Sequence, residues 1–388
     1  MNNIELINLT KYIDIVNSGI DEFEGNKKYI ATGSLETKNI LGFELVDYDS
    51  RPSRANMQFK ENDIIFAKMK DTEKVFLIDA DSSNHIYSTG FTGLRIKNLN
   101  EINPKYIFYW VRSKEFQNEK NRKCTGSTQK AINNTNLKKI LLPFVPLEEQ
   151  THIVKKLDKI DSLIEYRCSS IGLLDNYIRN VFYQMFGDMS TNLKQWDLKK
   201  LKELGKIQTG NTPPRKNPEN YGDYIEWIKS DNINTPNTYL TQSKESLSEI
   251  GYSIGRIAPE KSILMTCIAG SISCLGNVAI ADREVAFNQQ INAISPNKYI
   301  NEIFLYYLIL YSKKYIQSFS KQSLKCIINK TTFEEIPIIC PPIELQNKFA
   351  NIVKKIDIIK TYQLDSKKEL EKLFNISLEK TFKGGRTC

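Results

Sequence analysis

The chain has 388 residues, 40% of them hydrophobic and 26% charged, which predicts a globular protein of two or more domains. Fifty-four Lys and Arg residues against 45 Asp and Glu residues give a net charge of +9, a balance that favours polyanionic partners but is shared by many unrelated proteins. No run of about 18 apolar residues is present, and the N-terminus lacks the basic and then apolar order of a secretory signal. We therefore expect a cytoplasmic protein with no membrane partner.

The cysteine and histidine content argues against several kinds of site. The seven cysteines include no CxxC pair and are odd in number, which argues against a disulfide framework and favours reduced thiols. His85 and His152 are the only histidines, so we expect neither a histidine-rich metal site nor a hydrolase that depends on an imidazole.

Residues 1–146 predict a mostly β first domain. Short apolar runs flanked by polar or turn residues, such as "ENDIIFAKMK" (61–70) and "STGFTGLRI" (88–96), are typical of strands. The segment "NRKCTGSTQK" (121–130) is a polar, basic loop that could contact phosphates or base edges, or could be an ordinary solvated turn. The candidate DNA-binding residues in it are Arg122, Lys123, Ser127, Thr128, Gln129 and Lys130.

A long helix is predicted over 147–186, within a central segment of 147–190. Glu148 and Glu149 complement the positive end of the helix dipole, and Gly187 ends the helix. Forty helical residues would span roughly 60 Å. Apolar residues recur in alternate steps of four and three, which predicts a partner helix, although a helix that covers only its own domain is the alternative. The seam residues are Ile153, Leu157, Ile160, Ile164, Ile171, Leu174, Ile178, Val181 and Met185, interrupted by Arg167.

Residues 191–341 predict a second domain of the same kind. Its strands include "PEKSILMTCIAG" (259–270) and "AFNQQINAISP" (286–296), which resemble the two strand segments of the first domain. A long polar loop, "KIQTGNTPPRKNPENYG" (206–222), offers side chains that bind phosphates and base edges. The candidate DNA-binding residues here are Thr209, Asn211, Thr212, Arg215 and Lys216, followed by Lys321, Gln322, Ser323 and Lys325 in a later loop.

The last segment, 342–388, repeats the central one. "PFVPLEEQ" (143–150) has an echo in "CPPIELQN" (340–347), and a shift of 196 residues without gaps also pairs Asn133 with Asn329 and Ile107-Phe108 with Ile303-Phe304. A period this long indicates a duplicated domain rather than a solenoid. The second seam, interrupted near Gln363, contains Phe349, Ile352, Val353, Ile356, Ile359, Leu370, Leu373 or Phe374, and Phe382.

No catalytic motif was found. The glycine-rich phosphate loops and the acidic tetrapeptide of amino methyltransferases are absent, and Asp223, Glu226 and Asp231 near Lys229 lack the spacing of a metal nuclease. Two alternatives to DNA recognition remain. One is a DNA-cleaving or DNA-modifying enzyme with its own recognition domains, and the other is a coiled-coil assembly protein without a nucleic-acid role.

The repeated segments "PLEEQ…IVKKLDKIDSLIE" and "PPIELQNKFANIVKKIDIIK", each after a divergent domain, resemble the conserved spacer regions of the DNA-specificity subunit of type I restriction-modification systems. "GKIQTGNTPPRKNPENYGDYIEWIKSDNIN" is similar to the opening of a target recognition domain in that family, and "FNQQINAISP" to its middle. The opening of the first domain, "GIDEFEGNKKYIATGSLE", lacks the GxTP loop.

The resemblance implies an α+β fold of two β-rich, mixed α/β target recognition domains separated by two long antiparallel helices in a coiled coil, with pseudo-twofold internal duplication. It also implies a non-enzymatic subunit that reads a bipartite, asymmetric double-stranded DNA target, with a gap set by the helical spacer. Its partners would be two modification subunits, which bind S-adenosylmethionine, and restriction subunits, while the chain itself binds no cofactor. The residues expected to serve spacing and subunit docking are Ile153, Leu157, Ile160, Ile164, Ile171, Leu174, Ile178, Phe349, Val353, Ile356, Leu370 and Phe374.

Overall fold

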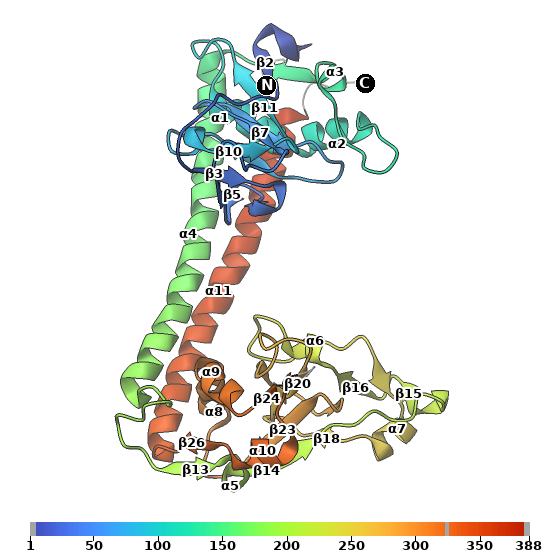
Figure 1. Ribbon diagram of the computed structural model, residues 1–388, viewed down its shortest axis with the longest axis vertical. Coiled ribbons are helices and arrows are strands. Elements are labelled where there is room, and N and C mark those ends of the chain that lie inside the picture. Colours follow the sequence, from blue (N-terminus) through green and yellow to red (C-terminus); the bar gives the residue numbers. More distant parts are fainter. Residues whose placement is uncertain (1–4, 323–325, 384–388) are drawn as a thin grey trace. The chain divides into compact units, whose positions relative to one another are not determined.

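The computed structural model describes residues 5–322 and 326–383, and the backbone alone at 321 and 322 (Figure 1). The chain forms two compact units. Unit 1 contains the described residues up to Ser169 and from Leu364 on, and unit 2 runs from Ser170 to Gln363. Two long helices belong to both units: α4 (Leu147–Phe186) begins in unit 1 and ends in unit 2, and α11 (Ile343–Phe382) runs from unit 2 into unit 1.

Unit 1 contains two four-stranded sheets. In the first sheet all neighbours are antiparallel, whereas β3 and β10 of the second are parallel. The first sheet has the order β2 (Ile13–Val16), β11 (Phe91–Ile96), β8 (Ile64–Ala67) and β9 (Val75–Leu77). The second has the order β6 (Glu44–Val46), β3 (Lys27–Ile30), β10 (Ile86–Ser88) and β7 (Ala55–Met57). Two smaller pairs are β1 (Glu5–Asn8) with β12 (Leu141–Phe144), and β4 (Leu35–Glu36) with β5 (Asn39–Ile40).

Unit 1 also contains short α-helices. They are α1 (Pro104–Arg112), α2 (Lys114–Arg122) and α3 (Asn134–Leu137), of which α1 packs against β8 and β9 of the first sheet. Asn103 caps α1 by accepting a hydrogen bond from the Lys105 amide, and Pro104 occupies the first turn, where its missing N–H costs nothing. Six consecutive residues of α1, from Tyr106 to Val111, are buried. This helix therefore lies between the sheet and the long helices.

Unit 2 repeats this arrangement. Its first sheet has the order β14 (Gly205–Thr209), β23 (Ile291–Pro296), β19 (Ile263–Thr266) and β21 (Val278–Ile280). The second has the order β15 (Tyr221–Gly222), β17 (Ser246–Leu247), β16 (Ile225–Ile228), β22 (Val285–Phe287) and β18 (Ile257–Ala258). Smaller sheets are β13 (Leu198–Lys200) with β26 (Pro337–Ile339), and β20 (Ile268–Ala269), β25 (Cys326–Ile327) and β24 (Lys321–Gln322). The helices are α5 (Leu201–Leu204), α6 (Ser230–Ile233), α7 (Glu249–Ile254), α8 (Glu302–Tyr311), α9 (Lys313–Ser318) and α10 (Lys330–Glu335).

The strand orders confirm the duplication. In each unit the second sheet contains one parallel pair, β3 with β10 and β16 with β22, at matching places in the order. Gln150 and Gln346, 196 residues apart, are both fully buried at the start of a long helix and make the same three kinds of hydrogen bond. Asn133 and Asn329 likewise cap α3 and α10.

The gapless register is wrong before α3 and α10. The caps of α1 and α8 are Asn103 and Asn301, which are 198 residues apart, so Ile107-Phe108 does not correspond to Ile303-Phe304. The difference of two residues arises in the next two helices, because α8 is one residue longer than α1 and α9 is three residues shorter than α2. Shortening a surface helix leaves the packed elements on either side in place.

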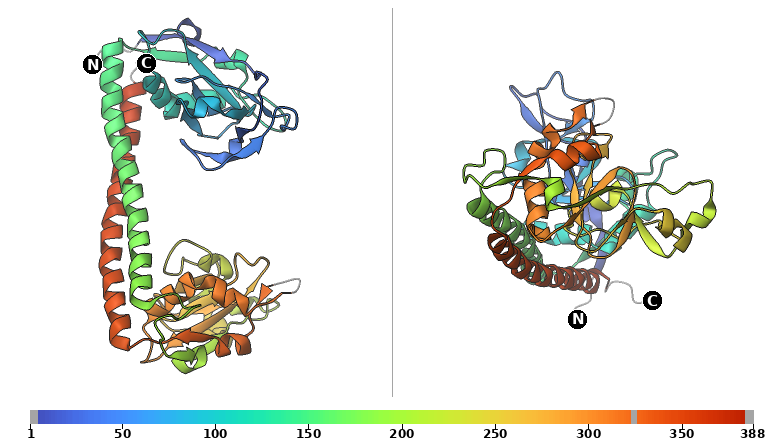
Figure 2. Two further views of the ribbon diagram at one scale, coloured as in Figure 1. Left: turned by 60° about the vertical axis from the view of Figure 1, so that its left-hand side comes forward. Right: turned by 90° about the horizontal axis from the view of Figure 1, so that it is seen from below.

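In unit 1 the first half of α4 packs beside the last half of α11 (Figures 1 and 2). The side chains that join them in one buried cluster are Val154, Leu157, Ile160, Phe374, Leu378 and Phe382. In unit 2 the other two halves meet, and the shared side chains are Ile178, Phe182, Phe186, Phe349, Val353 and Ile356. The antiparallel pairing of the two helices is thereby confirmed in both units.

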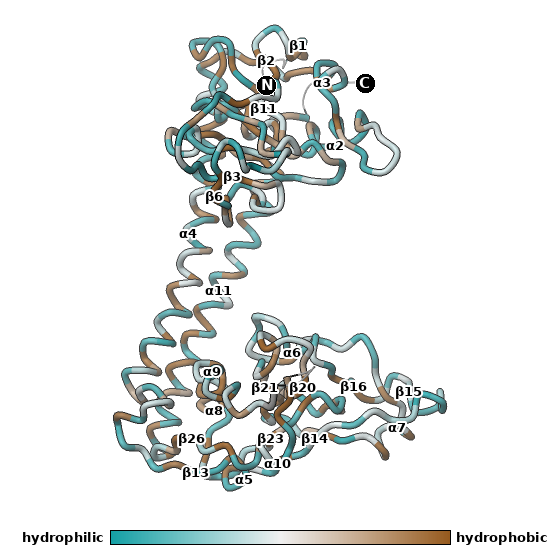
Figure 3. Tube along the Cα trace, in the orientation of Figure 1, coloured by the Kyte–Doolittle hydropathy of each residue, from teal (hydrophilic) through white to brown (hydrophobic). Residues whose placement is uncertain are grey.

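The hydropathy of α4 and α11 alternates along their length, as Figure 3 shows. Every residue of the expected α4 seam is buried or half-buried. In α11, Phe374 is buried while Leu373 is 49% exposed, and Ile359, also expected in the seam, is 46% exposed. Of the alternatives Leu373 and Phe374, the seam residue is thus Phe374. A helix of 3.6 residues per turn drifts away from a fixed alternation of threes and fours, which explains the exposure of Ile359.

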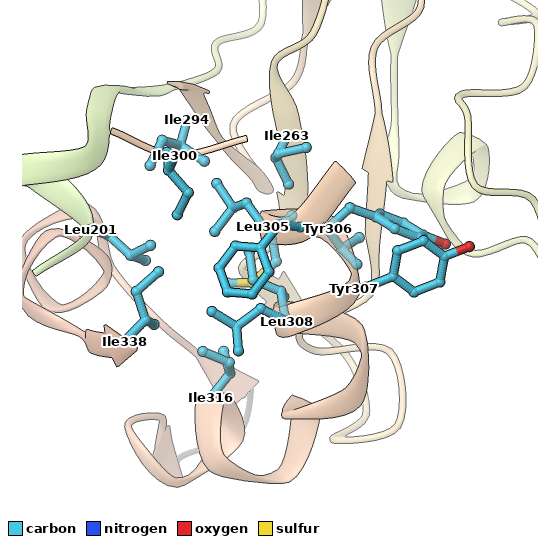
Figure 4. Close-up of a cluster of buried hydrophobic side chains, with 14 of the residues drawn as sticks. Leu201, Ile263, Ile294, Ile300, Leu305, Tyr306, Tyr307, Leu308, Ile316 and Ile338 are labelled. Atoms are coloured by element: carbon cyan, nitrogen blue, oxygen red, sulfur yellow. The ribbon is translucent and has the colours of Figure 1, made fainter. Parts of the chain in front are cut away.

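The core of unit 2 lies between α8 and the first sheet. Leu305 and Leu308 of α8 lie among Ile263, Ile294 and Ile316, all of them buried (Figure 4). Because β14 pairs with β23 of this sheet, the core supports the strand that leads into the loop after β14. No helix in the described ranges is long and apolar enough to cross a membrane.

Candidate nucleic-acid interface

The loop after β14 is held closely against the segment that begins at Phe287. The Gly210 amide donates to the Ile291 carbonyl (3.1 Å) and the Asn211 amide to the Phe287 carbonyl (3.0 Å). A Cβ on Gly210 would lie 2.2 Å from the Asn288 carbonyl oxygen, so only glycine fits at this approach. The loop and the segment 287–292 are therefore one structural feature, although they are far apart in the sequence.

Three of the expected DNA-binding side chains shape this loop. Asn211 Nδ2 donates to the Ile254 carbonyl (3.0 Å), and its Oδ1 accepts from the Arg256 amide (2.8 Å). Thr209 Oγ1 donates to Asn292 Oδ1 (2.7 Å), and Thr212 Oγ1 donates to Gln289. With these polar atoms engaged inside the unit, the three side chains hold the loop in shape.

The next residues present two cations. The Tyr221 hydroxyl donates to the Pro213 carbonyl (2.7 Å) and Asn220 Nδ2 to the Pro214 carbonyl (3.1 Å), which fixes the backbone just before Arg215. The side chain of Arg215 is 55% exposed, and Lys216 beside it is also exposed. The loop therefore carries its positive charge on a braced backbone.

Arg215 belongs to a cluster that also contains Tyr221, Trp227, Lys229 and Glu245. Its guanidinium carbon lies 4.5 Å from the ring centroid of Tyr221 and 5.0 Å from that of Trp227, and its Nη2 is 2.8 Å from Glu245 Oε2. Lys229 Nζ lies 5.0 Å from the Trp227 ring and pairs with the other oxygen of Glu245. Two cations thus lie over aromatic rings and share one carboxylate. We refer to these five residues as the Arg215 cluster.

The two cations of the cluster favour the ionised form of Glu245. The hydrogen bond from Lys229 lowers the pKa of Glu245 most, and the one from Arg215 lowers it further against the opposing effect of burial. With Glu245 ionised, the cluster has a net charge of +1. An exposed guanidinium with a fixed plane suits bidentate contacts to guanine edges or to phosphates.

Sequence reasoning named Arg215 but missed its partners. Glu245 lies 30 positions away, and in "NYGDYIEWIKSD" (220–231) the acidic residues stand out more than the aromatic residues between them. Of those acids, Glu226 forms a bidentate pair with Arg283, at 2.9 and 2.7 Å. Aromatic residues interleaved with lysine and arginine were the available signal. In the described parts of the chain, no group of three or more His, Cys, Asp or Glu residues could hold a metal ion.

Comparison with known proteins identifies the family. The model of the type I restriction modification DNA specificity domain matches residues 5–168 and again 193–372. The chain belongs to this family. The type I restriction enzyme HindI specificity subunit of Haemophilus influenzae is 23% identical, over 85% of this chain and 88% of that protein. The MjaVIII specificity subunit of Methanocaldococcus jannaschii is 24% identical, over 91% and 84%.

Two solved structures share the fold. A chain from a study of complex assembly and conformational transition of the type I system aligns with a TM-score of 0.63 and 19% identity, over 100% of this chain and 99% of that one. The S subunit from M. genitalium aligns with a TM-score of 0.53 and 18% identity, over 98% and 96%.

The expected family and fold class are thus confirmed. As a specificity subunit, the chain is a DNA-recognition component and not an enzyme, and subunits of this kind assemble with methyltransferase and restriction subunits. Both alternatives, an enzyme with its own recognition domains and an assembly protein without a nucleic-acid role, are set aside by this membership.

The specificity subunit does not repeat the Arg215 cluster in unit 1. The loop between β2 and β3, residues 17–26, occupies the matching place in the strand order, yet it carries Asp21, Glu22 and Glu24 and no basic residue. The loop of unit 1 is therefore acidic and lacks the two cations, Arg215 and Lys216, of the corresponding loop of unit 2.

The expected loop of unit 1 is shorter than the sequence suggested. Arg122 is the last residue of α2, and both Arg122 and Lys123 form ion pairs with Glu119. Residues 125–130 beyond them are all exposed, and they include the expected Ser127, Thr128, Gln129 and Lys130. Of the matching residues in unit 2, Ser323 and Lys325 lie outside the described residues, and for Lys321 and Gln322 only the backbone in β24 is described.

The expected spacer residues lie on the inner side of the helices. Ile153, Leu157, Ile160, Ile164, Ile171, Leu174, Ile178, Phe349, Val353, Ile356, Leu370 and Phe374 are all buried or half-buried. Large apolar residues also occur on the outer side of the helices. The most exposed are Tyr166 (76%), Leu173 (67%), Ile358 (58%) and Tyr362 (71%).

Proposed function

We propose that this specificity subunit reads a bipartite, asymmetric double-stranded DNA target, with one half-site for each unit. The observation that carries the proposal is a duplicated fold with divergent loops, because two units of one architecture but different surface chemistry suit two different half-sites. Domain boundaries at 146, 190 and 341 remain predictions. Because its substrate is DNA, we place its action in the cytoplasm.

In unit 2 the proposed contacts are Arg215 and Lys216, supported by Lys229. Their charge, exposure and braced backbone favour this role. Thr209, Asn211 and Thr212 would act by holding the loop. Lys321, Gln322, Ser323 and Lys325 stay in the proposal as a second set on the same unit.

In unit 1 the proposed contacts are those of the segment that follows α2. Ser127, Thr128, Gln129 and Lys130 are exposed, and hydroxyl, amide and ammonium groups are donors that bind phosphates and base edges. Arg122 and Lys123 would add positive charge behind them, although each shares Glu119.

We propose that α4 and α11 set the gap between the half-sites and dock two methyltransferase subunits. Their inner residues hold the pair together, so docking would use the outer side, where Tyr166, Leu173 and Tyr362 are exposed. S-adenosylmethionine would bind to the methyltransferase subunits and not to this chain.

The test is methylome sequencing of cells that express the chain with its methyltransferase subunit. We expect one methylated motif made of two short defined elements with an unspecified gap between them. A single continuous motif would contradict the proposal. Binding of the purified complex should also weaken steeply with salt, because phosphate contacts release counterions.

A further inference from the structure

Unit 1 carries an exposed apolar stripe on the segment that forms β6. Leu41, Phe43 and Leu45 are 64%, 52% and 63% exposed. They occupy alternate positions, so in an extended chain they lie on one side. Apolar residues exposed singly are common, but three in one stripe mark an interaction surface.

The stripe lies at an open sheet edge. β6 is the terminal strand of its sheet, and no strand in the described part of the chain pairs with its outer side. Lys28 is paired with Leu45 across the ladder and holds its ammonium 5.1 Å from the Phe43 ring. Ile30, two residues after Lys28 on the same face of β3, is fully buried in the core. The stripe therefore lies on the same side of the sheet as this core, at the edge where no other described part of the unit covers it. An open edge with apolar side chains readily accepts a further strand.

Unit 2 shows the same edge closed. Lys28 pairs with Leu45 in unit 1, and Glu226 pairs with Ser246 at the matching place in unit 2. This register matches the stripe with the polar residues Gln242, Lys244 and Ser246. There β15 also pairs with the outer side of β17, so the chain supplies the covering strand itself.

The charge around the stripe indicates what covers it in unit 1. Residues 21–49 contain seven acidic and three basic residues, in a chain whose net charge is +9. One of the three, Lys38, is paired with Asp161 and Glu165 of α4. Such a surface repels DNA phosphates and attracts a basic polypeptide.

We propose that β6 is a docking edge for an extended segment of the methyltransferase subunit, with apolar side chains at alternate positions and basic residues beside them. The segment adds a strand to the second sheet of unit 1, as β15 does in unit 2. This inference rests on the proposed assembly with a methyltransferase subunit, and it assigns one surface of this chain to that partner.

The test transplants the residues of unit 2 into unit 1. The variant Leu41→Gln/Phe43→Lys/Leu45→Ser carries side chains that the matching strand already tolerates, and Phe43→Lys alone is a milder version. Leu99→Ser is the matched control, because Leu99 is an exposed (52%) apolar residue of unit 1 outside the stripe. Hydrogen exchange at β8 and β11 checks that each variant is folded.

Affinity for the purified methyltransferase subunit is then measured for each full-length variant. We expect the triple variant to bind at least about tenfold more weakly, Phe43→Lys to lie in between and Leu99→Ser to bind as the parent does. In the parent complex the amides of β6 should gain protection from hydrogen exchange.

Four results would overturn the inference. Equal binding by the triple variant would refute the docking edge alone, whereas a parent chain that binds no methyltransferase subunit would refute the proposed assembly as well. Loss of DNA affinity in the isolated triple variant would assign the stripe to DNA. A parent dimer that the triple variant disperses would assign it to a second copy of this chain.

Discussion

The two recognition units share a strand order but differ in the groups that line corresponding places. The loop after β14 in unit 2 is braced and presents the cations Arg215 and Lys216, while the loop after β2 in unit 1 is acidic and has no basic residue. The junctions with the helices differ as well. Asp161 of α4 pairs with Lys38 and Arg112 in unit 1, whereas its counterpart Asp357 in α11 forms no ion pair among the described residues. Duplication preserved the scaffold, and divergence changed the charges placed on it.

Of the predicted effects, we expect the largest from a substitution at the junction between unit 1 and α4. Asp161→Ala leaves Lys38 and Arg112 without their shared carboxylate, in a place where all three side chains are 18% exposed or less. Breaking such a pair should destabilise unit 1 by about 3 kcal/mol. Asp357→Ala removes a half-buried carboxylate without a salt bridge, so unit 2 should change by less than about 1 kcal/mol. Hydrogen exchange at β11 and at β23 measures the stability of unit 1 and of unit 2 separately. Equal losses of stability from Asp161→Ala and Asp357→Ala would contradict this difference between the two junctions.

The loop comparison predicts the next effect. Arg215→Ala/Lys216→Ala should weaken binding by about 1–3 kcal/mol for each bidentate hydrogen-bonded pair with a base that the change removes, and it should relax one half-site only. The matched change in unit 1, Asp21→Ala/Glu22→Ala, should leave both half-sites intact and slightly raise affinity for random DNA. Binding assays with variant half-sites check this. Equal weakening on specific and random DNA would show that Arg215 and Lys216 bind phosphates only.

Glu245→Gln tests whether the shared carboxylate controls how unit 2 binds DNA. The change removes one negative charge and the group that holds Arg215 and Lys229 together. We expect a few-fold higher affinity for random DNA and a few-fold lower preference for the specific site. Glu44→Gln, on the matching strand of unit 1, is the control and should change neither. A fall in both affinities would mean that Glu245 only stabilises the fold.

Lowering the pH should change the stability contributions of Asp161 and Asp357 in opposite directions, with a smaller effect than the substitutions above. Burial alone would raise the pKa of Asp161, but Arg112 and Lys38 outweigh it and lower the pKa, so its stabilisation is lost only as pH falls below the usual aspartate range. Burial raises the pKa of Asp357, so its charge destabilises unit 2 at neutral pH and the penalty is relieved as pH falls. Between pH 7 and about 4, protection in unit 2 should rise slightly relative to an Asp357→Asn variant. An identical pH dependence in the parent chain and in the Asp357→Asn variant would show that the charge of Asp357 does not destabilise unit 2.

The long helices could be predicted because their signals are local. Pro146, Glu148 and Gly187 mark the ends of the first, and the apolar spacing marks its inner side. The structure places the first helix at the expected bounds and the second inside the expected segment 342–388. The change of the repeat offset from 198 to 196 residues could not be predicted, because it is the net result of one extra residue in α8 and three fewer in α9, and neither change alters the helix caps on either side.

The candidate site could be predicted only in part. A basic, proline-containing loop is visible in the sequence, and Arg215 was found there. The partners of Arg215 were not, because Glu245 and Trp227 reach it only through the pairing of β16 with β17. Similarly, Asn211 was expected to face DNA, yet tertiary contacts with Ile254 and Arg256 use its amide.

We propose that the two units read two half-sites and that the lengths of α4 and α11 set the gap between these half-sites on DNA. The most direct test inserts one heptad into each helix, near Ile171 and near Lys367, and determines the methylated motif by sequencing. Seven helical residues add about 10 Å, so we predict unchanged half-sites separated by a gap about three base pairs longer. An unchanged gap, or a change in either half-site, would contradict the account.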